Sequence, residues 1–333
     1  MKHRIGVLIS TLIGLLIFIA IATGVGFRNI LQVFINSNFI WFIPYLIVSA
    51  LIILTLVLRW NVVLLSYGYN VSFFNLILYH LAGFATGYLS PVPISGGEPT
   101  KAFFLNKEGI DFKHALSSII IDKSVEMTTT VVFSVMGAVF LILHITLAGY
   151  TIFSILIGIV GAVSILVLFY YFIVKDIHVF SIIFKKLKFI NKDFVKRNLP
   201  QVKDTEKRIG RFFKHHTFAF KVTLLLSVIS WLFMLIEYKL LMMTIGYNAG
   251  LTVLFLVIAV VAIAYVLPIP AALGVLEGGQ ASVSKLAKIP VQDSFALSIL
   301  IRVRELIITF IGLLYMFNYG IKFRRGSRFS MKV

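Results

Sequence analysis

The sequence contains no cysteine, which excludes disulfide bonds, thiol catalysis and cysteine-ligated metal sites. Charged residues are also scarce: they make up 13% of the chain, against about a quarter of a typical soluble domain. There is no zinc-type His-Glu-x-x-His motif, no phosphate-binding loop and no dinucleotide-binding glycine pattern. These absences exclude the best-marked soluble enzyme classes, and we predict neither a metal nor a cofactor.

Hydrophobic residues dominate what is there: they form 59% of the 333 residues, and the mean hydropathy is +1.00. Apolar runs near the length of about 20 residues that a helix needs to cross a bilayer recur along the chain. We therefore predict one integral membrane domain over 1–333, an all-α polytopic membrane protein with six full spans. The predicted spans are 5–26 (too long for a signal peptide), 39–58, 112–144, 151–174, 218–244 and 293–319.

Basic residues exceed acidic residues, 31 against 13, so the formal net charge is +18. In a soluble protein this excess would suggest nucleic acid, but in a membrane protein it marks cytoplasmic segments beside anionic lipid head groups. The excess is concentrated in the polar loop 175–217 and in the C-terminal tail. We predict a plasma-membrane protein with both termini and this loop in the cytoplasm and no nucleic-acid partner; the oligomeric state is open.

Two proline-rich interruptions break the apolar pattern, PVPISGGEP at 91–99 and PIPAALGVLEGG at 268–279. The apolar segments before them, 72–90 and 251–267, are short for a full crossing. Proline lacks a backbone donor and paired glycines are flexible, so we predict a non-helical tip at 91–99 followed by a short return helix. Each interruption is therefore expected to form a re-entrant hairpin whose backbone is satisfied by protein or by a cavity.

The two interruptions belong to an internal repeat, 39–144 and 218–320. Pro91-Val92-Pro93 corresponds to Pro268-Ile269-Pro270, Glu98 corresponds to Glu277, and an Ala-Leu-Ser triplet follows each glutamate. Counting crossings between the basic segments makes the first hairpin enter from the cytoplasm and the second from outside. The repeat is therefore predicted to be inverted, a pattern that points to a transporter's binding site.

Charged side chains in membrane segments cost about 2.5–3.5 kcal/mol each on insertion scales, so they are either paired or functional. Pairs three residues apart are expected on single helices, Lys123 with Glu126 and Arg302 with Glu305. Arg59 is expected at the membrane interface, and Glu237 is expected to snorkel towards it. The residues expected to line one central substrate path are Pro91, Pro93, Gly96, Gly97, Glu98, Lys101, Asp122, Lys123, Glu126, Pro268, Pro270, Gly274, Glu277, Arg302, Arg304 and Glu305.

PVPISGGEPTKAFFL, together with the later Asp122-Lys123 pair, resembles the transmembrane region of lysylphosphatidylglycerol synthases and their flippase-like relatives. The second interruption is similar to that family's proline-glycine-glutamate segment, but it has Ala271 and Ala272 where glycines are expected. The resemblance implies a membrane domain that moves aminoacylated or otherwise modified lipids between leaflets. No aminoacyl-transferase domain follows Tyr319 in this sequence, so we expect no synthase activity.

The predicted function is flippase-like movement of a polar-headed, phosphate-bearing lipid, aminoacylated or glycosylated, across the bilayer. Lys101, Lys123, Arg302 and Arg304 would attract the phosphate. One alternative is a membrane enzyme that transfers a group to or from a lipid carrier, with Glu98 and Asp122 as its acid and base. Another is a non-catalytic partner that recruits a soluble lipid-modifying synthase through its basic block.

Overall fold

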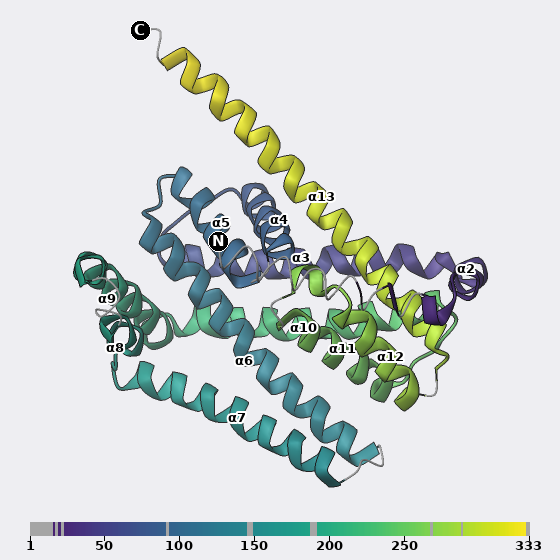
Figure 1. Ribbon diagram of the computed structural model, residues 1–333. Helices are drawn as coiled ribbons and strands as arrows, with labels where there is room; N and C mark the ends of the chain where they lie inside the picture. The colour runs from purple at the N-terminus through teal and green to yellow at the C-terminus, as the bar shows by residue number, and fades with distance from the viewer. Residues whose placement is uncertain are drawn as a thin grey trace. The chain divides into compact units, whose positions relative to one another are not determined.

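The computed structural model describes residues 16, 19–20, 23–90, 93–144, 149–186, 192–266, 269–287 and 289–330. Every regular element in these ranges is helical (Figure 1). The α-helices are α2 (Phe27–Asn36), α3 (Phe42–Ser66), α4 (Phe73–Leu89), α5 (Pro93–Lys107), α6 (Phe112–His144), α7 (Gly149–Val174), α8 (Val179–Lys186), α9 (Lys192–His215), α10 (Thr217–Thr244), α11 (Leu251–Val266), α12 (Val275–Ala287) and α13 (Val291–Ser330). Two short 3₁₀ helices are η1 (Phe39–Trp41) and η3 (Pro270–Ala272).

Four described helical segments are long and apolar enough to cross a membrane: Phe39–Ser66, Phe112–His144, Ile152–Val174 and Thr217–Thr244. They confirm the predicted all-α class and four of the predicted spans. The predicted first span, 5–26, lies mostly outside the described residues. The predicted last span, 293–319, falls within the 40-residue helix α13, which is not among the four.

The first interruption is shorter than predicted. Helix α5 already begins at Pro93 and continues through Pro99, so the prediction of a non-helical tip at 91–99 is wrong for residues 93–99. Proline suits a first helical position, where its missing N–H would have no intrahelical partner in any case. The glycines serve close packing: a Cβ on Gly97 would lie 2.9 Å from the carbonyl oxygen of Gly83 on α4. Short helices α4 and α5 therefore pack backbone to backbone.

In the second interruption, α-helix begins again before the end of the predicted tip. After α11 ends at Val266, a 3₁₀ turn covers 270–272, and α12 begins at Val275, so the second part of the predicted tip 268–279 is helix. Ala271 and Ala272 have φ angles of 53° and 50°, in the left-handed region that glycine adopts freely. Such residues cost about 1–3 kcal/mol each and persist only where surrounding contacts hold them.

The chain divides into two units, each described here by itself. Unit 1 contains 1–51, 74–101 and 233–333, and unit 2 contains 52–73 and 102–232, so that α3, α5 and α10 each contribute to both. In unit 1, α11 packs on α12 and α12 on α13, and α13 also contacts α2 (Figure 1).

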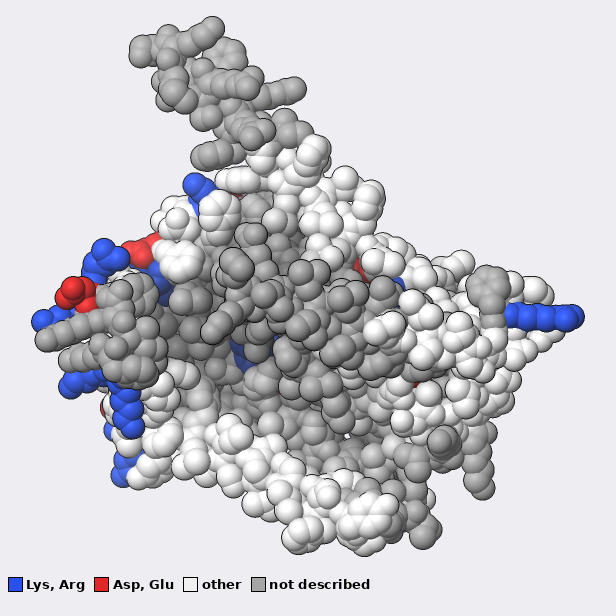
Figure 2. Space-filling model, viewed as in Figure 1, with Lys and Arg blue, Asp and Glu red and all other residues white. Residues whose placement is uncertain are grey.

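In unit 2, α6 and α7 lie side by side and antiparallel, and α9 contacts α6, α7 and α8 (Figure 1). Buried Val63, Ile121, Ile209 and Phe212 form a core where α3, α6 and α9 meet. The predicted basic loop 175–217 thus contains two helices, α8 and α9. Figure 2 shows lysine and arginine gathered over these helices, whereas the surface over α7 carries little charge.

Candidate functional site

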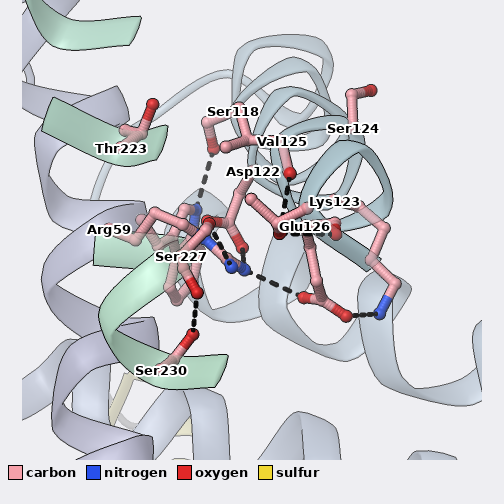
Figure 3. Close-up of polar contacts among 12 residues, drawn as sticks. Arg59, Ser118, Asp122, Lys123, Ser124, Val125, Glu126, Thr223, Ser227 and Ser230 are labelled. Atoms are coloured by element: carbon pink, nitrogen blue, oxygen red, sulfur yellow. Dashed lines mark hydrogen bonds and ion pairs between the residues drawn. The ribbon is translucent and has the colours of Figure 1, made fainter. Parts of the chain in front are cut away.

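Arg59 of α3 lies at the centre of a charge cluster in unit 2, and only 1% of it is exposed. Its Nε is 2.6 Å from Asp122 Oδ1, and its Nη2 donates to Asp122 Oδ2 at 3.1 Å and to Glu126 Oε2 at 2.9 Å. Its Nη1 donates to Ser227 Oγ of α10 at 3.0 Å (Figure 3). The prediction that Arg59 anchors the membrane interface is wrong: every nitrogen of its guanidinium has an acceptor inside the protein.

The same cluster confirms one predicted pair. Lys123 Nζ lies 2.6 Å from Glu126 Oε1, three residues along α6 (Figure 3). Two cations thus face two carboxylates, and charge is balanced within what we call the Arg59 cluster: Arg59, Asp122, Lys123, Glu126 and Ser227. Because buried ions are stable only when paired and fully hydrogen-bonded, this balance explains how the cluster persists in the interior.

In unit 1, Arg302 of α13 holds the second interruption in place. Its Nε donates to Glu277 Oε1 at 2.5 Å, its Nη1 to the carbonyl oxygen of Ala271 at 2.9 Å and its Nη2 to that of Ala272 at 3.4 Å. Glu277 is fully buried in the first turn of α12, and its Oε2 accepts the Gly274 N–H at 2.8 Å. The guanidinium and the carboxylate together offset the strain of the two left-handed alanines.

Glu237 of α10 is also buried, with 2% exposed, so the prediction that it snorkels is wrong. Its Oε1 accepts from Arg304 Nη1 at 2.5 Å and from the hydroxyl of Ser49 on α3. Arg304 Nη2 lies 3.4 Å from Glu305 Oε1, and its Cζ lies 5.9 Å from the centre of the Tyr45 ring. The Glu237 carboxylate therefore lies inside the protein, paired with Arg304, and does not reach towards the membrane interface.

The Tyr88 hydroxyl lies within hydrogen-bonding reach of Arg302 and Glu305 and joins the two groups of unit 1. We call the combined set the Arg304 cluster: Glu237, Glu277, Arg302, Arg304 and Glu305. It contains three carboxyl groups and two guanidinium groups. Within the cluster, the buried Arg304 Nε finds no partner among the described residues. The same holds for two buried hydroxyls on the helices that carry the cluster, those of Tyr45 and Thr309.

The two clusters have the same arrangement with opposite charges: the central residue is an arginine in one and a glutamate in the other. Arg59 on α3 meets carboxylates on α6, whereas Glu237 on α10 meets an arginine on α13. Each central residue also forms a hydrogen bond with a serine of the other helix of the pair α3 and α10. Arg59 of α3 donates to Ser227 of α10, and Glu237 of α10 accepts from Ser49 of α3. Both serines lie ten residues before the central charge of their own helix, Ser49 before Arg59 and Ser227 before Glu237.

The remaining predicted path residues fall in the interrupted segments. Pro91 and Pro268 lie outside the described residues. Glu98 and Lys101 are partly buried on α5, in unit 1. Pro93, Gly96 and Gly97 belong to α5, Pro270 begins η3, and Gly274 precedes α12 with a φ of 77°.

Of the residues expected along the path, Asp122, Lys123 and Glu126 belong to unit 2, and Glu277, Arg302, Arg304 and Glu305 belong to unit 1. Sequence reasoning missed Arg59 and Glu237. The signal was present, because Arg59 is the only charged residue of the apolar helix α3 and Glu237 is the only acidic residue of the apolar helix α10.

A further feature of unit 2 is an apolar cavity of about 290 Å³ between α7, α8 and α9. Leu168 and Phe172 contribute to its wall, and His178 and Lys207 contribute polar groups. Glu206 of α9 accepts the backbone N–H of Phe180 at 2.6 Å and thereby ties α8 to α9. No described group of histidine, aspartate and glutamate residues is arranged to hold a metal ion.

Apolar membrane-length helices that enclose two buried charge clusters define a polytopic membrane protein with a polar interior. The chain matches the family model described as the lysylphosphatidylglycerol synthase TM region over residues 5–312, and it belongs to that family. It is also similar to the UPF0104 membrane protein MJ1595 of Methanocaldococcus jannaschii, with 25% identity over 247 residues, which cover 72% of each chain. No solved structure matches the chain significantly.

Proposed function

We propose that the protein moves a polar-headed, phosphate-bearing lipid between the two leaflets of the plasma membrane. Membership of a family of lysylphosphatidylglycerol synthase transmembrane regions supports a link to lipids that carry a modified head group. The observation that carries the proposal is the Arg304 cluster, whose charged groups are buried and whose Arg304 Nε finds no partner in the described part of the chain. Ionisable groups at such depth are costly, and in membrane proteins they mark paths for polar or charged substrates.

We further propose that two inverted repeats build this path. The exchange of serines between α3 and α10, with the same ten-residue spacing, supports a two-fold relation between the first repeat and the second. The short helices that precede the interruptions, α4 and α11, fit re-entrant segments. In such transporters the substrate site lies near the middle of the bilayer where the repeats meet, and each repeat closes one side in turn.

Helices α8 and α9 are proposed to rest on anionic lipid head groups at the cytoplasmic surface, with both chain termini on the same side. Positive side chains near an anionic leaflet each contribute about 1 kcal/mol of attraction. The cavity between α7, α8 and α9 supports this placement, because its apolar wall is suited to an acyl chain beneath the head groups.

The test is reconstitution of the purified protein in liposomes that contain a panel of labelled lipids, scored for accessibility of each label in the outer leaflet. The variants Glu277→Gln and Arg302→Gln should abolish transfer, because each removes one side of the buried pair. The variant Asp193→Asn, at an exposed carboxylate of α9, is the matched control and should transfer at the wild-type rate. Wild-type transfer by both cluster variants, or product formation by the protein in detergent where no leaflets exist, would contradict the proposal.

A further inference from the structure

The cavity between α7, α8 and α9 is open to the surroundings of α7. Its volume of about 290 Å³ is close to the lower limit of about 300 Å³ for small-molecule pockets, so it has room for part of one hydrocarbon chain. Ile165, Leu168, Phe169 and Phe172 of α7 and Ile209 of α9 line it. Ile165 and Leu168 are 72% and 49% exposed, and no residue of the most apolar stretch of α7 is buried inside the protein. The apolar part of the cavity is therefore accessible from the lipid around α7.

The lining changes from apolar to polar towards the end of α7. The lining residues of α7 itself are apolar, whereas Asp176 and His178, which follow the helix, add polar groups. Glu206 of α9 accepts the backbone N–H of Phe180 at 2.6 Å, which places the neighbouring Lys207 beside the same end of the cavity. A phospholipid has its groups in this order, a hydrocarbon tail followed by a charged head. The cavity is therefore suited to a lipid that enters with its tail along α7.

The two carboxylates of the lining already have partners. Asp176 accepts from Lys214 Nζ at 2.6 Å. Glu206 accepts from two backbone N–H groups in the first turn of α8, at 2.6 and 3.1 Å, and from the Ser181 hydroxyl. By contrast, Lys207 is exposed and forms no hydrogen bond or ion pair with the described residues. Its ammonium group is therefore available to an anionic head group.

Two further cations extend the positive charge along α9. Lys203 and Arg211 lie four residues before and after Lys207, so the three residues share one face of the helix, and all three are exposed. They belong to the basic surface that Figure 2 shows over α8 and α9. Each lysine or arginine near an anionic leaflet contributes about 1 kcal/mol of attraction. The charge around the polar end of the cavity thus favours an anionic over a zwitterionic head group.

We propose that this cavity binds an anionic phospholipid of the cytoplasmic leaflet, with one acyl chain between α7 and α9 and the phosphate beside Lys207. The bound lipid fastens α8 and α9 to the membrane surface, and it stabilises the fold because it binds the folded protein. The inference deepens the proposed contact of these helices with anionic head groups. It does not rest on lipid transport, which we place at the Arg304 cluster of unit 1.

Photo-crosslinking of the purified full-length protein in detergent tests the site. The probes are phosphatidylglycerol and phosphatidylcholine that carry the same diazirine-labelled acyl chain, and mass spectrometry of peptides locates the labelled residues. Phosphatidylglycerol should label residues 165–180 and 206–210 several-fold more strongly than phosphatidylcholine does. Equal labelling of these segments by the two lipids, or no labelling by either, would overturn the proposal.

Two variants test the tail and the head group separately. Gly210 lines the cavity and nothing lies within 4 Å of a Cβ added to it, so Gly210→Leu should fill the cavity and remove most of the labelling. Gly158→Leu, at an equally open position of α7, is its control and should keep the labelling. Lys207→Gln should weaken labelling by phosphatidylglycerol several-fold and leave labelling by phosphatidylcholine unchanged. Its control is Lys196→Gln, at an exposed lysine about three turns earlier on α9, which should change neither.

Wild-type labelling by phosphatidylglycerol in Lys207→Gln, or in a folded Gly210→Leu protein, would overturn the proposal, and the first of these results does so even if Gly210→Leu does not fold. Thermal unfolding in the same detergent measures the stabilisation. Added phosphatidylglycerol should raise the unfolding temperature of the wild type by several degrees and that of Lys207→Gln by less, and an unchanged temperature in the wild type would contradict the stabilising role. A protein that is labelled at this site but moves no lipid in liposomes supports the site and contradicts the proposed function alone.

Discussion

The two buried charge clusters differ in how completely they are satisfied. In the Arg59 cluster two cations meet two carboxylates, and the guanidinium of Arg59 has an acceptor at each nitrogen. In the Arg304 cluster three carboxyl groups meet two arginines, and Arg304 Nε and Thr309 Oγ1 have no partner among the described residues. A complete network rigidifies a fold, whereas an incomplete one leaves room for a ligand. We therefore propose a structural role for the first cluster and place the proposed transport role at the second.

The largest expected effect is on stability, at Arg59. Arg59→Ala leaves the carboxylates of Asp122 and Glu126 without their buried counter-ion, and breaking a buried pair in this way costs about 3–5 kcal/mol. Denaturant unfolding in detergent measures the free energy, and Arg28→Ala, at an exposed position, is the control that should change it by less than about 0.5 kcal/mol. If Arg59→Ala lowers the free energy of unfolding by less than about 1 kcal/mol, the structural role of this cluster is contradicted.

A smaller loss is expected at Gly312, where α13 rests on α4 near the Arg304 cluster. A Cβ there would lie 2.3 Å from the carbonyl oxygen of Leu81, so Gly312→Ala must push the two helices apart, at a cost of about 1–3 kcal/mol. Gly158→Ala on α7 is the matched substitution, because nothing lies within 4 Å of its added Cβ, and it should be neutral or stabilising. Equal unfolding free energies for the two variants would contradict the close approach of α13 to α4.

How far the sequence predicts these clusters depends on the distance between partners along the chain. The pair of Lys123 and Glu126 follows from helical spacing alone, and it was predicted. Arg59 meets Asp122 across 63 positions, and Glu237 meets Ser49 across 188, so no local pattern reveals either contact. The start of α5 was missed for another reason: proline ends one helix and begins the next with equal ease, so Pro93 alone does not decide between tip and helix.

A gain in stability is expected at the strained turn of the second interruption. Ala271→Gly and Ala272→Gly each relieve a left-handed φ, and the gain should be about 1 kcal/mol per position, reduced by the greater freedom of glycine in the unfolded chain. Thermal unfolding of single and double variants measures it. A loss of stability in both single variants would show that the alanine side chains contribute more than their backbone strain costs.

The smallest effect concerns the exposed pair of Asp176 and Lys214 near α8 and α9. Lys214 Nζ donates to Asp176 at 2.6 Å, and this hydrogen bond, together with the positive charge, holds the pKa of the Asp176 carboxyl below its usual range. The pair stabilises the folded protein at pH values above the usual pKa of an aspartate. This stabilisation is lost as the pH falls through the lowered pKa of Asp176. Carbon NMR titration of Asp176 should show its pKa rise in Lys214→Ala, and an unchanged midpoint would contradict the pairing.

The comparison of the two clusters is tested most directly by measuring unfolding and leaflet transfer on the same preparations of Asp122→Asn and Glu305→Gln. Asp122→Asn leaves the Arg59 cluster with excess positive charge and should unfold several kcal/mol more easily. Glu305→Gln preserves the size of the side chain and its capacity for hydrogen bonds, so it should keep a stability within about 1 kcal/mol of the wild type and lose lipid transfer. A stable Glu305→Gln protein that moves lipid at the wild-type rate would contradict the assignment of the working site to the Arg304 cluster.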